Sequence, residues 1–575
     1  MVMTRNKGKI FGREFGENKS IVGLLFLALS IFMVQSCAKI GKPSGGPIDK
    51  TGPKILRTSI PNGSINVQTK QITLCFDEFV VLNNPSKHVT VSPPLQYPLS
   101  FRLKGKHLIM SWEDTLKPST TYVFDLDGAV KDLHEGNVLE NYVFAFSTGA
   151  FLDTLSLYGR LLDAKTLKPL PDIFVALYDG KDDSSVFKRL PEHITRSDAQ
   201  GYYSFMFLDK KSFRLFAYSD DNQNFRYDLL SEKFAFKDSL VTPVYYNYKD
   251  SSKTVEKHRH LPNEMHVLKV YTPLPERQGV KSDKLLDPGR WQIVLQRPAD
   301  RFSVKWITPE WNESDYYVKW NKGQDTVDLY TWHPSETGEY KLVVFDGATF
   351  SDTLQQKNDG AEAGNSKNKI EHRPGKVILK TNLSKEHPYF QDIVLSINEP
   401  VQYIDTNKIL KLCASDDTVA LALKIQPDHR SVKLLANIQD GRDYKLLVPD
   451  SLFFGNENRT HDSLNIAFRT TKDDDYGAIN IRLESTRIPL SSLVLFLSDS
   501  KNNSYYPVIT REGNYLFEHL SEGSYTLKIW HDQNENKRWD VGDYWQNRLP
   551  ETVMEYPKTF SVRAGWEISE TWVVP

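Results

Sequence analysis

The feature that most constrains the fold of this chain is a segment that recurs 321 residues later. Residues 72–80 read ITLCFDEFV and residues 393–401 read IVLSINEPV. In both copies apolar residues alternate with other residues, which is the period of a β-strand, and an acidic turn follows. Further along, Phe146 corresponds to Phe468 at an offset of 322. A drift of one residue over this length indicates a duplicated domain.

A second repeat covers a different part of the chain. Residues 201–228 align without a gap with residues 513–540, at an offset of 312. Gly201-Tyr-Tyr-Ser-Phe corresponds to Gly513-Asn-Tyr-Leu-Phe, and each reads as a strand that leaves a glycine turn. The modules therefore follow the order A, B, C, A′, B′, where C is a β-rich region without a copy.

Composition and patterning point to a folded, all-β protein. The chain has 575 residues, which corresponds to roughly four domains or somewhat more if they are small. The hydrophobic fraction of 39% excludes a disordered chain and a polytopic membrane protein. No segment after residue 37 shows a long apolar stripe with helical period. We expect tandem β-sandwiches at residues 52–149, 153–262, 266–354, 377–471 and 474–575, with a polar linker at 355–376.

The N-terminus reads as an export signal. An apolar run of 14 residues, 21–34, follows five basic residues and precedes Cys37. This run is shorter than the ~20 residues that cross a bilayer. The cysteine after it resembles a bacterial lipobox, in which the thiol is acylated; Ser36 fits that pattern and Gln35 is an unusual neighbour. We predict a signal peptide at 1–36 and a tether at 37–51. An uncleaved anchor or an ordinary signal is the alternative.

The net charge excludes one class of partner, and the positions of the cysteines indicate whether they form a disulfide. The 72 basic and 73 acidic residues leave a net charge of −1, so no basic field exists to hold nucleic acid. Removal of residues 1–36 takes away five basic and two acidic residues, which gives 67 − 71 = −4. Cys75 and Cys413 fall in strand-like segments of different modules. We expect both to be reduced and partly buried.

The first module resembles the SbsA-type bacterial Ig-like domain of S-layer proteins. The resemblance is carried by Pro61-Asn62-Gly63, residues 72–80, Leu116–Tyr122, Gly136-Asn137 and Phe146-Ser147-Thr148. The fourth module resembles a degenerate copy. The second and fifth modules resemble carboxypeptidase-regulatory or transthyretin-like sandwiches, through residues 157–161 and 201–205. The whole order is similar to a family of Gram-negative surface lipoproteins, which implies an envelope location and an architecture without catalysis.

A loop in the fifth module is the best candidate for a metal site. Oxygen-bearing side chains fall at positions 1, 3, 5, 9 and 12 of the loop 532–543, and Arg538 at position 7 offers a carbonyl. This spacing suits Ca²⁺, which takes six to eight oxygen ligands. Two features depart from the pattern: Lys537 replaces a glycine and Asp543 replaces a longer glutamate. The candidate ligands are Asp532, Asn534, Asn536, Arg538, Asp540 and Asp543.

The second module carries a weaker version of the same loop. Its acids and amides persist, but position 12 is Ser231, with Glu232 one residue later. In both loops the alternative is that Asp and Asn side chains build Asx turns at a strand exit. The weaker candidate ligands are Asp220, Asn222, Asn224 and Asp228.

Other possible sites have weaker signals. Trp306, Trp311 and Trp320 in the third module could form a sugar-binding surface, although such residues more often fill sandwich cores. His258 and His260 lack an evident third zinc ligand. The pairs Asp77-Glu78 and Asn398-Glu399 read as turns rather than as acid/base pairs. The chain contains no common hydrolase, phosphate-loop or dinucleotide fingerprint.

These observations predict a lipid-anchored, multi-domain Ig-like protein of a bacterial outer membrane that is not an enzyme. Its expected role is structural or in binding an envelope protein. A glycan-binding surface lipoprotein of an uptake system is the runner-up, and a hydrolase without a local signature is a third hypothesis. The residues after Cys37 lack the acidic cluster that some surface-export signals carry. This feature favours the periplasmic face of the outer membrane over the outer face but does not decide between them.

Overall fold

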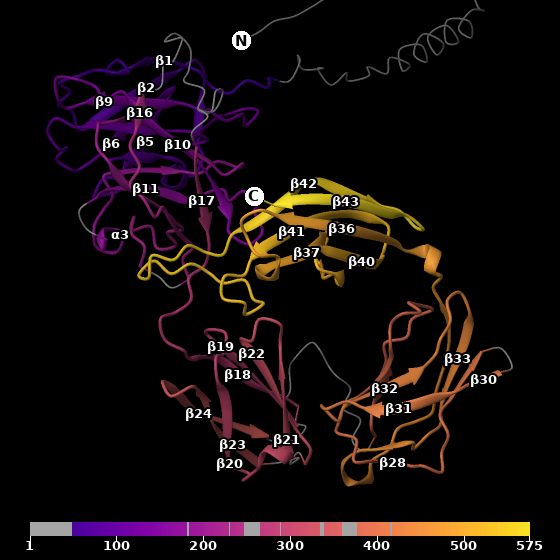
Figure 1. The fold of residues 1–575 in the computed structure, drawn as a ribbon. Coiled ribbons are helices and arrows are strands. Elements are labelled where there is room, and N and C mark those ends of the chain that lie inside the picture. Colours follow the sequence, from indigo (N-terminus) through magenta and orange to yellow (C-terminus); the bar gives the residue numbers. More distant parts are fainter. Residues whose placement is uncertain are drawn as a thin grey trace, which may run out of the picture.

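The computed structural model describes residues 49–574, apart from 181–182, 229–230, 246–264, 288, 334–337, 359–375 and 415–416. Five β-sandwich modules follow one another along this chain (Figure 1). Helical structure in the described residues consists of short turns: α2 (Pro85–His88), α3 (Ser185–Lys188), η1 (Glu313–Asp315), η2 (Asn456–Asn458), η3 (Asp473–Asp475) and η4 (Leu490–Ser492). The expected all-β fold is therefore confirmed. None of these helices has the length and hydropathy needed to span a membrane.

The first module is a sandwich of two main sheets. One sheet has the strand order β1-β2-β6-β5, the other β4-β7-β9, and β3 pairs with β8 at one end. Its core lies between the sheets and is rich in aromatic rings. The ring centroids of Trp112 and Phe124, for example, are 5.4 Å apart. The strands are β1 (Ile55–Thr58), β2 (Gln71–Phe76), β3 (Val80–Leu82), β4 (Thr90–Ser92), β5 (Ser100–Lys104), β6 (His107–Ser111), β7 (Thr121–Asp125), β8 (Val130–Asp132) and β9 (Val143–Ser147).

The fourth module repeats this topology. Its sheets run β25-β27-β32-β31 and β26-β35-β33-β29-β30, with β28 paired to β34. The strands are β25 (Leu379–Thr381), β26 (Glu386–His387), β27 (Ile393–Ile397), β28 (Tyr403–Ile404), β29 (Lys411–Ala414), β30 (Asp417–Val419), β31 (Leu421–Ile425), β32 (Ser431–Ala436), β33 (Asp443–Val448), β34 (Phe453–Phe454) and β35 (Leu464–Thr470). The duplicated sequences at 72–80 and 393–401 begin in matching strands, β2 and β27. Cys75 and Cys413 are free, half-buried thiols, as expected.

The second module is also built from two sheets. The strand β10 lies between β13 on one side and β16 and β17 on the other, and the second sheet runs β12-β11-β14-β15. The strands are β10 (Leu155–Asp163), β11 (Phe174–Asp179), β12 (His193–Arg196), β13 (Tyr202–Leu208), β14 (Phe213–Tyr218), β15 (Phe234–Phe236), β16 (Val244–Tyr245) and β17 (His266–Val270).

The fifth module follows the same plan. One sheet runs β39-β40-β36-β43 and the other β38-β37-β41-β42. The strands are β36 (Gly477–Ser485), β37 (Leu493–Asp499), β38 (Ser504–Tyr505), β39 (Val508–Arg511), β40 (Asn514–Leu520), β41 (Gly523–His531), β42 (Val553–Val562) and β43 (Glu567–Val574). In each copy the last strand pairs in parallel with the first, β17 with β10 and β43 with β36.

This parallel pairing corrects one predicted boundary. We expected the second module to end at residue 262 and the third to begin at 266, but β17 belongs to the second module. Gly159 in β10 allows the approach, because a Cβ there would lie 2.1 Å from the carbonyl oxygen of His266. Tyr203 donates a hydrogen bond to the same oxygen at 2.8 Å. A parallel partner distant in sequence leaves no local pattern, so strand period alone could not assign it.

The third module packs the sheets β18-β19-β22-β21 and β20-β23-β24 against each other. Its strands are β18 (Val280–Asp287), β19 (Arg290–Leu295), β20 (Phe302–Thr308), β21 (Tyr316–Trp320), β22 (Thr326–Thr331), β23 (Gly338–Asp346) and β24 (Phe350–Asn358). The predicted linker began at residue 355, but β24 continues to Asn358 because it pairs with β23 along its whole length. The rest of that linker, 359–375, lies outside the described residues, as do Cys37, His258 and His260.

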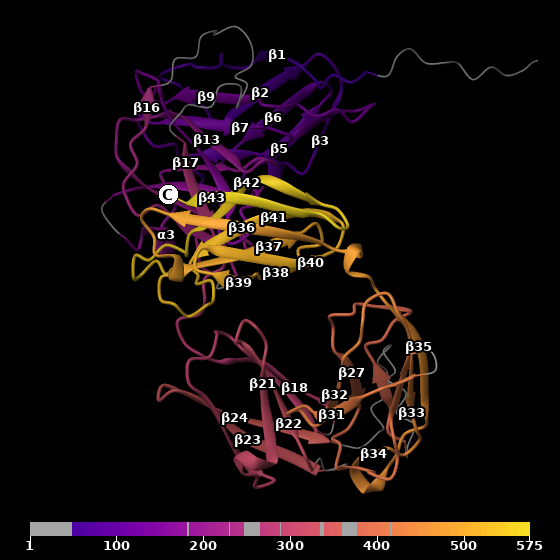
Figure 2. The same cartoon turned by 45° about the vertical axis from the view of Figure 1, so that its right-hand side comes forward.

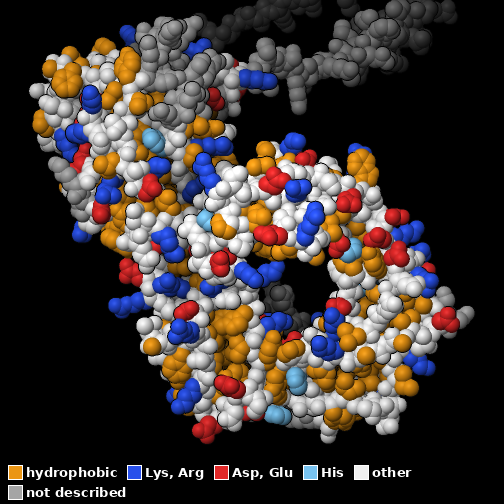
Figure 3. Space-filling view, in the orientation of Figure 1, with side chains coloured by type: hydrophobic (Ala, Val, Ile, Leu, Met, Phe, Trp, Pro, Cys, Tyr) orange, Lys and Arg blue, Asp and Glu red, His pale blue; other side chains and the backbone are white. Residues whose placement is uncertain are grey.

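The third, fourth and fifth modules surround an opening (Figures 1 to 3). Arg430 of the fourth module forms an ion pair of 2.8 Å with Asp287 of the third. At the next junction Phe390 stacks on His519, with ring centroids 3.9 Å apart. The circuit is completed between the fifth and third modules, where Arg538 donates a hydrogen bond of 3.0 Å to the Gln324 side chain. The chain therefore returns toward its own earlier modules.

Candidate functional site

The Asp/Asn loop of the fifth module starts where β41 ends. Asp532 is buried, and its carboxylate accepts hydrogen bonds from the backbone N–H groups of Asn536 and Lys537 at 3.1 and 2.7 Å. Asn536 in turn accepts from the backbone N–H of Arg538 at 2.7 Å. Lys537 adopts a left-handed φ of 58°, so the missing glycine is tolerated at a conformational cost of about 1 kcal/mol. These contacts are Asx turns that wind the loop tightly.

Two amides and two carboxylates complete this loop. The side-chain amides of Asn534 and Asn536 both donate to Asp540, at 2.6 and 2.9 Å. Glu551, which sequence analysis missed, accepts from the backbone N–H groups of Gln533 and Asp540 at 2.9 and 3.0 Å. Burial raises the pKa of Glu551 above its ordinary value, and the carboxylates of Asp540 and Asp532 add to that rise. The loop is thus closed by a glutamate 19 residues after its start.

The loop of the second module has the same geometry. Asp220 accepts from the backbone N–H of Asn224 at 3.0 Å, and the amides of Asn222 and Asn224 donate to Asp228 at 3.0 and 2.6 Å. Glu232 is fully buried, at 0% exposed, and accepts from the N–H groups of Asp221 and Asp228. Glu232 therefore matches Glu551 in role. The two copies differ in how many residues separate the aspartate from this glutamate.

The predicted calcium ligands are only partly brought together. Asp532, Asn534, Asn536 and Asp540 converge, whereas the Asp543 backbone pairs with Arg548 in a separate turn. The side chain of Arg538 donates to Gln324 of the third module, and the carbonyl of Arg538 stays a predicted ligand. In the described residues no group of three or more His, Cys, Asp or Glu side chains is arranged to hold a metal. The converging groups already satisfy one another by hydrogen bonds, and calcium binding stays a prediction.

The remainder of the fifth-module loop docks on the second module. Tyr544 packs edge-on against Phe216, Phe234 and Phe236, with ring centroids 5.0 to 5.7 Å apart. Its hydroxyl donates a hydrogen bond of 2.7 Å to the carbonyl oxygen of Asp183. Gly542 lies against Tyr271, because a Cβ at that position would come within 2.6 Å of its ring. Residues 532–551 are therefore an inter-module clamp, which we call the docking loop.

Polar contacts reinforce this interface at its edge. Lys528 on β41 donates a hydrogen bond of 2.7 Å to the carbonyl oxygen of Thr166, and Lys168 donates to the side chain of Asn502 at 3.1 Å. Leu167 between them packs with Trp539 in a small apolar cluster. Sequence analysis missed this interface. The adjacent pair Tyr544-Trp545 was its one available signal, since a hydrophilic loop rarely carries neighbouring Tyr and Trp.

The tryptophans of the third module do not form an exposed platform. Trp306 is 4% exposed and belongs to the core, which corrects its assignment as a ligand-binding residue. Trp311 is half-buried and packs edge-on against it at 4.6 Å. Trp320 is half-buried against Phe302 at 5.0 Å. The alternating pattern of β20 places Trp306 on the inner face, because sheet residues two apart point the same way.

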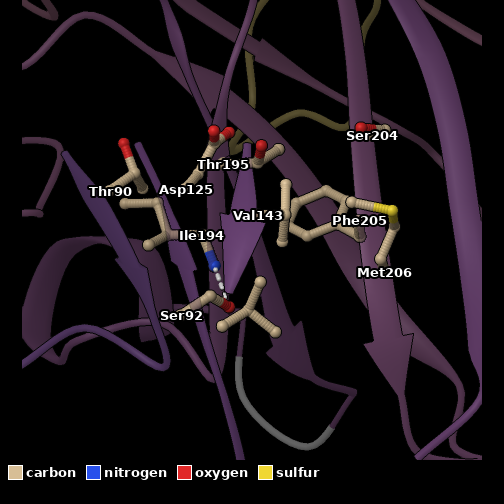
Figure 4. Close-up of a pocket in the computed structure, with 10 residues that line it drawn as sticks. Thr90, Ser92, Asp125, Val143, Ile194, Thr195, Ser204, Phe205 and Met206 are labelled. Atoms are coloured by element: carbon tan, nitrogen blue, oxygen red, sulfur yellow. Dashed lines mark hydrogen bonds between the residues drawn. The ribbon is translucent and has the colours of Figure 1, made fainter. Parts of the chain in front are cut away.

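The first and second modules meet around a small pocket with a mixed polar and apolar lining (Figure 4). Thr90, Ser92 and Asp125 line it from the first module, and Thr195 and Ser204 from the second. The backbone N–H of Ile194 donates to the Ser92 hydroxyl at 3.2 Å. The Ser92 hydroxyl thus links the two modules, and a Lys87–Asp172 ion pair of 2.7 Å supports the same junction.

Comparison with known proteins identifies one module. Residues 49–148 match the family model of the bacterial Ig-like domain. The first module is a bacterial Ig-like domain. A comparison with curated protein sequences gives no match.

A comparison with solved structures returns bacterial surface proteins among its matches. Domains 1–6 of the surface layer protein SbsC share 10% identity over 94% of this chain and 70% of that one, with a TM-score of 0.14. A second SbsC structure, rSbsC(31-844), shares 11% over 88% and 67%, also at 0.14. The Bacteroides ovatus mixed-linkage glucan utilization protein SGBP-B, solved with a heptasaccharide, shares 10% over 52% and 71%, at 0.12. These TM-scores are too low to support a fold assignment, so the all-β fold class rests on the strand order of this protein alone.

Proposed function

We propose that this protein is a lipid-anchored scaffold of a bacterial outer membrane, with a structural or protein-interaction role and without catalysis. The observation that carries the proposal is the docking loop, which clamps the fifth module onto the second and turns a string of modules into a closed body. The polar clusters described above hold loops or modules in place. A bacterial Ig-like domain beside the predicted lipidation site, Cys37, agrees with display at an envelope surface.

The proposal includes a finer assignment for two modules. The second and fifth modules are carboxypeptidase-regulatory or transthyretin-like sandwiches. Their shared strand order, with the last strand parallel to the first, supports a common origin. Their Asp/Asn loops are structural elements that brace a strand exit, and calcium, where it binds, stiffens them.

Two measurements test the proposal. Mass spectrometry of the N-terminal peptide from native membranes is expected to show an acylated Cys37 and no residues 1–36. Small-angle scattering of the mature chain is expected to give the closed arrangement. An N-terminus that retains residues 1–36 would contradict the anchor, and an extended chain in solution would contradict the closed scaffold.

A further inference from the structure

The end of the first module that receives the tether exposes large apolar side chains. Phe79 is 51% exposed and Leu133 is 53% exposed, and the two are neighbours because the backbone N–H of Leu133 donates to the carbonyl oxygen of Phe79 at 3.0 Å. Leu56 is exposed at the same end, in a bulge at the start of β1. Monomeric proteins rarely cluster such side chains without a partner. We call this end, residues 49–56, 77–79, 104–106 and 133–137, the tip.

The tether is tied to the tip by direct contacts. The amide of Asn137 donates a hydrogen bond of 3.1 Å to the carbonyl oxygen of Asp49. The backbone N–H of Lys54 donates to the carboxylate of Asp77 at 2.8 Å, and Gly52 is so close to Val138 that a Cβ would lie 2.0 Å from its carbonyl oxygen. The path by which the chain enters the module is therefore fixed beside Phe79 and Leu133.

The distance to the lipidation site limits what can cover the tip. Asp49 is twelve positions after Cys37, and even a fully extended segment of this length spans at most ~40 Å. An acylated Cys37 would keep the tip within that distance of the bilayer. The first module also lies at one end of the molecule, with the third and fourth modules at the other (Figures 1 and 2).

Charges around the tip are mixed. Lys106 lies 5.6 Å from the centre of the Phe79 ring, and Lys50, Lys54 and Lys104 are exposed nearby. Aliphatic lysine stems beside apolar rings suit the headgroup region, where the ammonium groups meet lipid phosphates.

The acidic groups of the tip are partly engaged. The Asp49 carboxylate accepts hydrogen bonds from both the N–H and the hydroxyl of Thr51, and that of Asp77 accepts from Lys54. Burial, followed by the carboxylates of Asp132, Asp77, Asp49 and Glu135, raises the pKa of Glu78 above its ordinary value. Glu135 remains exposed.

We propose that the tip rests on the lipid surface, with Phe79 and Leu133 inserted among the headgroups. This inference rests on the proposed anchoring through Cys37 and deepens it: the membrane is a second point of contact, not only the site of the acyl chain. The acyl chain and the tip together fix the orientation of the first module relative to the bilayer. A tether alone would leave the module free to rotate.

The test uses the mature chain, 37–575, with Cys75 and Cys413 changed to serine and one tetradecyl chain coupled chemically to Cys37. A single chain of this length binds membranes reversibly, so added contacts are measurable. Vesicles of phosphatidylethanolamine with a minority of phosphatidylglycerol are the probe, and the partition coefficient is measured by sedimentation. We expect Phe79→Ser/Leu133→Ser to lower the coefficient about tenfold. Phe151→Ser/Leu240→Ser, at 66% and 53% exposed, is the matched control and is expected to change little.

Equal partition of the tip variant and the unsubstituted chain overturns the proposal, as does an equal loss in the control. Hydrogen exchange of the unsubstituted chain gives a second readout: vesicles should protect peptides covering 76–80 and 132–137. Because the acyl chain is attached chemically, this result does not depend on natural lipidation. Failure of the anchor in cells would appear separately, as an unmodified Cys37.

Discussion

Trp545 of the fifth module stacks on Phe187 of the second, with ring centroids 4.9 Å apart and ring planes at 14°. The two residues are 358 positions apart in the chain, and among the described residues no strand pairing connects their modules. The contact follows from the docking loop, which leaves the fifth module and covers the outer face of the β12-β11-β14-β15 sheet. The chain is thus closed by side-chain packing between two copies of the same module.

The closure predicts a large effect of Tyr544→Ala. The substitution removes the ring that packs among Phe216, Phe234 and Phe236, and it also removes the hydrogen bond to Asp183. Burial of a side chain of this size contributes about 2 kcal/mol to docking. We expect a larger radius of gyration in small-angle scattering. Tyr97→Ala, at an exposed site on the first module, is the control, and an unchanged radius for Tyr544→Ala would show that the interface does not depend on this ring.

Calcium binding is testable at Asp540. The carboxylate of Asp540 accepts from Asn534 and Asn536, and both amides would have to turn their oxygens toward a bound ion. We expect millimolar Ca²⁺ to raise the melting temperature of the mature chain and Asp540→Asn to remove that rise, because the ion needs the negative charge. Magnesium at the same concentration is the control. An unchanged melting temperature in the presence of Ca²⁺ would mean that hydrogen bonds alone hold the loop.

Acid should weaken the second module through Asp209. His193, followed by Lys211, lowers the pKa of Asp209 to about 2. The nearest His193 nitrogen is 3.8 Å away, which is too long for a hydrogen bond, whereas the Lys211 ammonium lies 2.7 Å from the Asp209 carboxylate. We expect a contribution of about 1 kcal/mol from this partly exposed site. A lowered pKa stabilises the fold above the unfolded value of 3.8, and this contribution is lost as the pH falls to about 2.

The matching variant is Asp209→Asn. We expect it to lower the free energy of unfolding near neutral pH and to match the unsubstituted chain at about pH 2, as measured by urea unfolding across that range. A cost that stays constant with pH would mean that packing, rather than charge, explains the loss.

The buried tryptophan of the third module gives a stability prediction. Trp306 packs against Trp291, Trp311 and Tyr340. Trp306→Ala should cost about 3–5 kcal/mol by leaving a cavity, as measured by urea unfolding. Trp566→Ala, at an exposed site in the fifth module, should change stability by less than about 0.5 kcal/mol.

If Trp311→Ala abolished binding on a glycan array without loss of stability, the glycan-binding hypothesis would gain support.

Local pattern predicted the strands and missed what holds distant strands together. The alternation in 72–80 placed β2, and the copy at 393–401 placed β27. The same reasoning ended the second module too early, since β17 is recognised only through its parallel partner β10. It also chose Asp543 as the last ligand of the docking loop. Glu551 closes the loop instead, by accepting hydrogen bonds from the backbone of Gln533 and Asp540, because the chain makes an extra turn before it returns.

The amino-acid sequence alone determined the modules, their duplication and their all-β character, because alternating side chains and turn residues act over a few positions. Only the tertiary structure decided which surfaces meet. Tyr544 and Trp545 stand out in a polar loop, but only the folded protein shows that their partner is an aromatic face of the second module. The sequence does not tell whether Trp306 belongs to a ligand-binding surface or to the core, and the packing of β20 decides between them. Contacts between residues hundreds of positions apart depend on how rigid modules are oriented, and no short-range pattern records that orientation.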